Sequence, residues 1–171
     1  MTRRTLHLEA DDEVGLWLAA IDDARRRTLE VVGGIASDGS PLDVGEDVVD
    51  RGRPNTIGSV LYHLAAIEAD WLLDDICGTP EEMTRELFPY DVREEGGMLT
   101  PVTSMRLDEH LAHLEKVRGM FHERLGSIGG QEFHRVNERA NYDVSPIWVV
   151  HHLLQHEAEH RAEIGAALRD A

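Results

Sequence analysis

The sequence is poor in cysteine, since Cys77 is the only one among its 171 residues. A single thiol excludes a disulfide framework, a thiolate zinc knuckle and a C-x-x-C redox pair. A lone cysteine fits a reducing compartment, so we expect a cytoplasmic protein. The first residues contain no apolar segment of the signal-peptide kind, and no run approaches the roughly eighteen apolar residues of a membrane span.

Positive charge is scarce as well. Lys116 is the only lysine, and 17 basic residues stand against 33 acidic ones, which gives a formal net charge of −16. Such a surface repels phosphate backbones and anionic headgroups. We therefore expect neither nucleic acid nor a membrane as a partner.

Aromatic residues make up only 5% of the sequence. Because sheets favour aromatic and β-branched residues, this composition indicates an all-α protein. A chain of this length can bury a core without disulfides or a structural metal, so residues 1–171 are expected to form one domain.

Four segments have helical periodicity. They are predicted to begin at Asp11 or Asp12, at Asn55 or Thr56, near Thr103, and at Ser145-Pro146, and to end at Val32, before Gly78-Thr79-Pro80, at Leu125 and near Arg169. Gly33-Gly34 is predicted to stop the first helix, and Pro146 suits the first position of the last one.

The predicted connections, at about 35–54, 79–102 and 127–144, are long for a simple up-and-down bundle. The acidic stretches at about 43–50 and 81–95 are interpreted as solvated loops. The sequence thus predicts a four-helix bundle with long connecting loops, of which at least one is a crossover or covers a site.

Four histidines crowd into the last predicted helix, at positions 151, 152, 156 and 160. At about 100° per residue, His160 lies within the apolar face, His156 lies on its edge and His152 lies further out. Residues at i and i+4 stand one turn apart, so His156 and His160 could share a metal ion. The alternative is that both are buried histidines satisfied by hydrogen bonds.

A metal site inside a bundle needs a third ligand from another helix. The candidates are His63 in the second helix and His110 or His113 in the third. His63 lies on the flank of its apolar stripe whereas His110 lies nearer the middle of its own, so helical phase by itself favours His110.

Two stretches resemble the DinB/YfiT-like proteins. Residues 55–64, Asn-Thr-Ile-Gly-Ser-Val-Leu-Tyr-His-Leu, are similar to the second helix of that family, and residues 150–164 are similar to its last helix. The resemblance implies that His63, His156 and His160 are the three metal ligands, with solvent or a substrate atom in the open positions. The family pattern often ends His-Arg-Gly-Gln-Ile, and this chain departs from it at Ala162 and Glu163.

The resemblance also implies a function. It indicates a metal-dependent enzyme, an S-transferase or isomerase that uses a low-molecular-weight thiol and an electrophile, and a homodimer. A metal held by neutral imidazoles keeps its full charge and lowers the pKa of a bound thiol or water. Zinc and nickel both accept imidazole ligands, so either ion fits.

Other interpretations remain open at the level of sequence. One is a metal-binding or stress-associated bundle without turnover. Another is a zinc peptidase, because residues 156–160 match H-E-x-x-H, although no histidine follows His160 to serve as its third ligand. Glu157 could orient a ligand or act as a base, or it could pair with Arg161. His152 could support the ligands or be semi-exposed, and Trp71 and Trp148 could pack or line a substrate pocket.

Overall fold

The computed structural model describes residues 8–36, 55–79, 81–94, 98–102 and 105–169. Its helices are α1 (Glu13–Ala36), α2 (Ile57–Asp70), the π-helix η1 (Trp71–Ile76), α3 (Glu81–Leu87), α4 (Leu107–Gly126), α5 (Gly130–Phe133) and α6 (Pro146–Arg169). Strands β1 (Asn137–Glu138) and β2 (Asp143–Val144) form a small antiparallel hairpin. The all-α prediction is confirmed.

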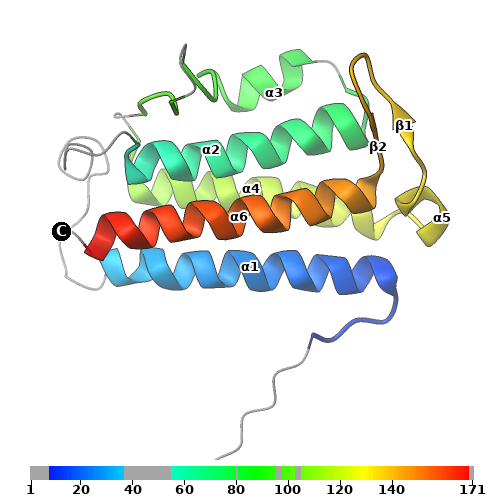
Figure 1. Cartoon of the computed structure of the whole chain (residues 1–171), viewed down its shortest axis with the longest axis horizontal. Helices are drawn as coiled ribbons and strands as arrows, with labels where there is room; N and C mark the ends of the chain where they lie inside the picture. The colour runs from blue at the N-terminus through cyan, green and yellow to red at the C-terminus, as the bar shows by residue number, and fades with distance from the viewer. Residues whose placement is uncertain (1–7, 37–54, 80, 95–97, 103–104, 170–171) are drawn as a thin grey trace, which may run out of the picture.

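Helices α1, α2, α4 and α6 form the predicted four-helix bundle (Figure 1). Helices α1 and α6 lie side by side and run in one direction, whereas α2 and α4 run together in the opposite direction. Because α2 and α4 are parallel, the chain between them returns along the bundle, and α3 lies on this return path. This long connection is therefore a crossover.

Three of the predicted helix starts agree with the structure. The Asp12 carboxylate accepts a hydrogen bond from the Gly15 backbone N–H at 2.7 Å, and the Thr56 hydroxyl accepts one from Ser59 N–H at 2.9 Å. Pro146 is the first residue of α6. Side chains that accept from the first turn satisfy N–H groups that have no partner within the helix.

Two predicted boundaries were wrong. Helix α1 continues through Gly33-Gly34 to Ala36, because a glycine lowers helix propensity without forcing the chain out, and Val32 is packed in the core at this point. Helix α4 begins at Leu107, where the Glu109 carboxylate accepts from the Arg106 backbone N–H at 2.8 Å. Thr103 lies outside the described residues.

The connections hold structure that periodicity does not predict. Helix α3 lies within the acidic stretch that was interpreted as a solvated loop, because Phe88 at its end is buried against the Tyr62 ring. Helix α5 and the β1–β2 hairpin occupy the connection before α6. Residues 37–54, which include the other acidic stretch, lie outside the described part of the chain.

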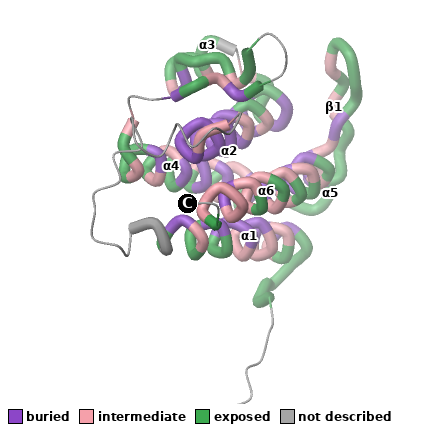
Figure 2. The backbone as a smooth tube through the Cα atoms, turned by 60° about the vertical axis from the view of Figure 1, so that its left-hand side comes forward, coloured by how far each residue is buried: buried purple, intermediate pink, exposed green. Residues whose placement is uncertain are grey.

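Helix α2 is the most deeply enclosed element, with α3 covering its outer side (Figure 2). Every residue of α2 except Ile67 and Asp70 is buried. The apolar core has two clusters, one toward each end of the bundle. Within the described residues, no helix is long and apolar enough to cross a membrane.

Candidate metal centre

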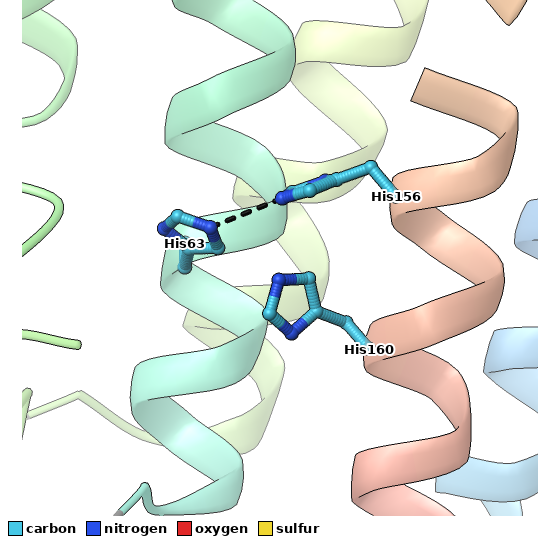
Figure 3. Close-up of side chains that lie close together, drawn as sticks. All are labelled: His63, His156 and His160. Carbon is cyan, nitrogen blue, oxygen red and sulfur yellow. Dashed lines mark hydrogen bonds between the residues drawn. The ribbon is translucent and has the colours of Figure 1, made fainter. Parts of the chain in front are cut away.

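Three histidines from two helices converge at the middle of the bundle (Figure 3). His63 of α2 faces His156 and His160 of α6, and one ligand nitrogen from each lies within 4.8 Å of the others. The Nε2 atoms of His63 and His156 are 3.0 Å apart, and the rings of His156 and His160 are 4.5 Å apart between centroids. The structure thus brings together the three residues that the family resemblance named.

Glu163 fixes the orientation of the His160 ring. The Glu163 carboxylate lies 2.9 Å from His160 Nδ1, which leaves Nε2 to face the other two histidines. Glu163 is itself held by the Asn55 amide, which donates to its other oxygen at 2.8 Å. A carboxylate on the outer nitrogen of a histidine is the usual arrangement around protein metal ions, because it sets the tautomer and raises the basicity of the ligand.

His63 and His156 are poor proton acceptors in this position. Burial, followed by the nearby His160, lowers the pKa of His63 to about 4, with the backbone carbonyl of Val92 acting in the opposite direction. Burial and then repulsion from His160 and His63 lower the pKa of His156 to about 3. Both rings are therefore neutral at pH 7, and neutral imidazole is the form that binds a metal ion.

The donor set fits a divalent transition metal. Tetrahedral coordination with metal–nitrogen bonds of about 2.0–2.1 Å places two ligand nitrogens about 3.3 Å apart. The 3.0 Å between the Nε2 atoms of His63 and His156 is within a few tenths of an ångström of that spacing. An ion held by these three histidines alone would keep coordination positions open, as in catalytic rather than structural sites.

The other candidates for the third ligand lie elsewhere. His110 is fully buried on α4, and neither of its ring nitrogens has a hydrogen-bond partner among the described residues. His113 packs edge-on against Phe88, with ring centroids 5.2 Å apart. Helical phase favoured His110 as the third member of the group, and this was wrong. Phase shows which face of a helix is buried, but it does not show which other helix packs against that face.

Glu157 pairs with arginine and is not a member of the three-histidine group. It is buried, and its two oxygens accept from Arg25 Nε at 2.8 Å and Arg25 Nη2 at 2.9 Å. Arg161, the partner considered from the sequence, donates instead to the Ala24 carbonyl. A paired carboxylate of this kind is not placed to serve as the general base of an H-E-x-x-H peptidase.

Arg25 and Glu157 belong to a buried ionic layer that sequence reasoning missed. Each of the four bundle helices contributes one residue to it: Arg25, Glu68, Arg118 and Glu157. Glu68 accepts from Arg25 at 2.6 Å and from Arg118 at 2.7 Å. The layer lies between the two apolar clusters, and its two positive and two negative charges balance. Glu157 directly follows His156 in the chain. The sequence feature that could have indicated this layer is the presence of arginine and acidic residues on the apolar faces of separate predicted helices.

His152, the other residue considered for a supporting role, lies outside the three-histidine group. Its ring is 5.9 Å from that of His156 and is stacked on Trp148 at 5.1 Å with an interplanar angle of 7°. It is half-buried, which agrees with the semi-exposed alternative.

Comparison with known proteins places these features in a family. A model of the DinB superfamily matches residues 20–164, a range that includes both motif stretches and all three histidines. A comparison with curated proteins finds no match.

Proposed function

Because the chain belongs to the DinB superfamily, we propose that His63, His156 and His160 bind one divalent metal ion, zinc or nickel, and that the protein uses this ion to activate a low-molecular-weight thiol. The proposed reaction is S-transfer to an electrophile or a related isomerisation. The convergence of three imidazole donors within 4.8 Å is the observation that supports it.

Each residue of the site has a defined task in this proposal. The ion, when bound, would supply the positive charge that lowers the pKa of a thiol toward neutrality. Burial keeps His63 and His156 neutral, so they bring no competing charge or proton. Glu163 holds His160 with Nε2 turned inward. In S-transfer the thiol sulfur forms a bond to carbon, the leaving group departs with the electron pair, and the thiol proton is released.

Elemental analysis of purified variants tests the metal site. We expect about one metal ion per chain in the wild type and a large loss in His63→Ala and His156→Ala. His110→Leu is the matched control, because His110 is an equally buried histidine outside the group. Full metal content in both alanine variants would refute the ligand assignment. Loss of metal in His110→Leu alone would identify His110 of α4 as a ligand instead.

Thiol dependence tests the chemistry. Metal-loaded protein should conjugate a dinitrophenyl halide faster with at least one of glutathione, bacillithiol, mycothiol and coenzyme A, and His160→Ala should abolish the acceleration. Metal binding without acceleration by any of these four thiols or by the ring-bearing 4-phenylbutane-1-thiol would favour the alternative of a non-catalytic metal-binding protein. The homodimer and the cytoplasmic location stay predictions, and sedimentation velocity tests the former.

A further inference from the structure

A row of rings runs along α6 away from the three histidines. Trp148, His152, His156 and His160 follow one another at intervals of four residues, so they lie along one side of the helix. The His152 ring links the two ends of the row, since it is 5.9 Å from His156 and stacked on Trp148 at 5.1 Å. Trp148 is therefore about 12 Å from His156 along the helix axis.

Two further rings from other elements join the outer end of this row. Trp71 lies 5.1 Å from His152 and 5.5 Å from Trp148, and Tyr142 lies 6.0 Å from Trp71. We call Trp71, Tyr142, Trp148 and His152 the aromatic platform. Its members come from η1, the segment joining β1 and β2, and α6, so segments far apart in the chain assemble it.

The rings of the platform are held in place by other residues, and yet two of them are exposed. Trp71 is the first residue of the π-helix η1, a rare conformation that is found frequently at functional sites. The Tyr142 hydroxyl donates to the buried Asp75 carboxylate at 3.0 Å, which anchors that ring. Even so, Trp148 is 48% exposed and Tyr142 is 47% exposed. Large aromatic side chains that pack only for stability are normally covered to a greater extent.

Carboxylates outnumber basic groups around the platform, since Asp70, Asp74 and Asp75 all act on Tyr142 and Arg139 pairs with Asp75. Burial, the hydrogen bond to Asp75 and the charges of Asp75, Asp74 and Asp70 raise the pKa of Tyr142 to about 12. The carboxylates that oppose a negative charge on the tyrosine would oppose one on a bound ligand as well. A ring that binds here is therefore expected to be neutral or cationic.

We infer that the aromatic platform binds a planar, neutral or cationic ring carried by the thiol whose sulfur reaches His63, His156 and His160. This inference rests on the proposed function and adds the class of thiol: a molecule with a ring joined to sulfur through a short flexible chain. The ring stacks on the platform while the chain runs along α6 past His152.

Binding of matched thiols to metal-loaded protein tests the inference. The probes are 4-phenylbutane-1-thiol, 4-cyclohexylbutane-1-thiol, which has a ring of similar size without a π-system, and 4-(4-mercaptobutyl)benzoate, which adds a carboxylate. Isothermal titration calorimetry should show the phenyl probe bound about 3- to 10-fold more tightly than the cyclohexyl probe, the size of effect that ring stacking adds to equal apolar burial. The benzoate probe should bind more weakly than the phenyl probe.

Two tryptophan variants locate the effect. Trp148→Leu should bring the ratio of phenyl to cyclohexyl affinity close to one. Trp17→Leu is the matched control, because Trp17 is a half-buried tryptophan on α1 that contacts His151 and lies outside the platform, and it should keep the wild-type ratio. Circular dichroism confirms that each variant is folded before its affinities are compared.

The same titrations on metal-free protein separate the two claims. If thiols bind equally with and without metal while the phenyl preference still depends on Trp148, the platform stands and the metal activation of thiols fails. If binding requires metal but the phenyl and cyclohexyl probes bind alike, or Trp148→Leu leaves the ratio unchanged, the platform inference is overturned and the proposed function stands. If neither the phenyl nor the cyclohexyl probe binds, the inference is overturned.

Discussion

Glu163 stands where the family pattern often has glutamine, and its carboxylate lies 2.9 Å from the outer nitrogen of His160. A carboxylate and an amide can both accept a hydrogen bond from Nδ1–H, but only the carboxylate adds negative charge. With a metal ion bound, this charge would make Nε2 a stronger electron-pair donor and would stabilise the cation. Glu163 in place of glutamine would thus affect metal binding although the three histidines are unchanged.

Glu163→Gln should weaken metal binding about tenfold, the lower end of the effect that such supporting residues have. The measurement is a competition titration with a chelator of known affinity. Glu159→Gln is the control, because Glu159 lies on the same helix, carries the same charge and is exposed. Equal affinities in the two variants would show that the charge of Glu163 does not reach the site.

At the residue scale the sequence predicted part of the site. The spacing of His156 and His160 identified the pair, and family resemblance, not phase, identified His63. The contact between His160 and Glu163 depends on side-chain rotamers, which periodicity does not determine. The predicted pairing of Glu157 with Arg161 was wrong. The actual partner, Arg25, is 132 residues away in sequence, and only the packing of α1 against α6 brings it to Glu157.

At the scale of elements, glycine marked one helix end correctly and one incorrectly. Gly78 follows η1 with a φ of 65°, a conformation that glycine adopts without steric cost. Gly33 lies inside α1, and an added Cβ would meet nothing within 4 Å. The two residues look alike in sequence, and burial of Val32 beside Gly33 decides the difference. Capping residues were the more reliable signals because they act within one turn.

Alanine at these two glycines should change stability in opposite directions. Gly33→Ala should raise the free energy of unfolding by up to about 0.5–1 kcal/mol, because alanine has the higher helix propensity. Gly78→Ala should lower it by about 1–2 kcal/mol, because the left-handed conformation places Cβ close to the carbonyl oxygen. Urea denaturation measures both, and destabilisation by Gly33→Ala would mean that α1 ends at Gly33 in solution.

At the scale of the whole molecule, the buried ionic layer joins all four bundle helices at mid-length. Burial opposes ionisation of Glu68, but Arg118 and Arg25 outweigh it and hold the pKa of Glu68 below its ordinary value of 4.5. A carboxyl group with a lowered pKa in the folded state stabilises the fold above the pKa of the unfolded state. This contribution is lost as the pH falls through the folded pKa.

Glu68→Gln should therefore destabilise the protein by about 3–5 kcal/mol at pH 7, because it leaves the two buried guanidinium groups of Arg25 and Arg118 with Glu157 as the one remaining carboxylate of the layer. The difference from the wild type should shrink as the pH falls below about 4.5, where the wild-type carboxyl group loses its own advantage. Urea denaturation across this pH range is the measurement. Glu30→Gln, which removes an exposed partner of Arg26, should change stability by less than about 1 kcal/mol.

Removal of the metal should leave the bundle folded. The core clusters and the ionic layer connect α2 and α6 independently of the histidines. Circular dichroism after chelation should thus show unchanged helix content, with a stability loss of about 4 kcal/mol where the free metal had been about 1,000 times its Kd. Unfolding on chelation would show that the site is structural.

A binding site that is assembled by the rest of the fold has a consequence for metal choice. Three imidazoles held in place by packing present the same donors to every first-row divalent ion, and the intrinsic affinities then follow the order in which copper exceeds both nickel and zinc. Cells grown on different trace-metal supplies should therefore yield the same folded protein carrying different ions, and selectivity in vivo would then depend on which metals the cell makes available.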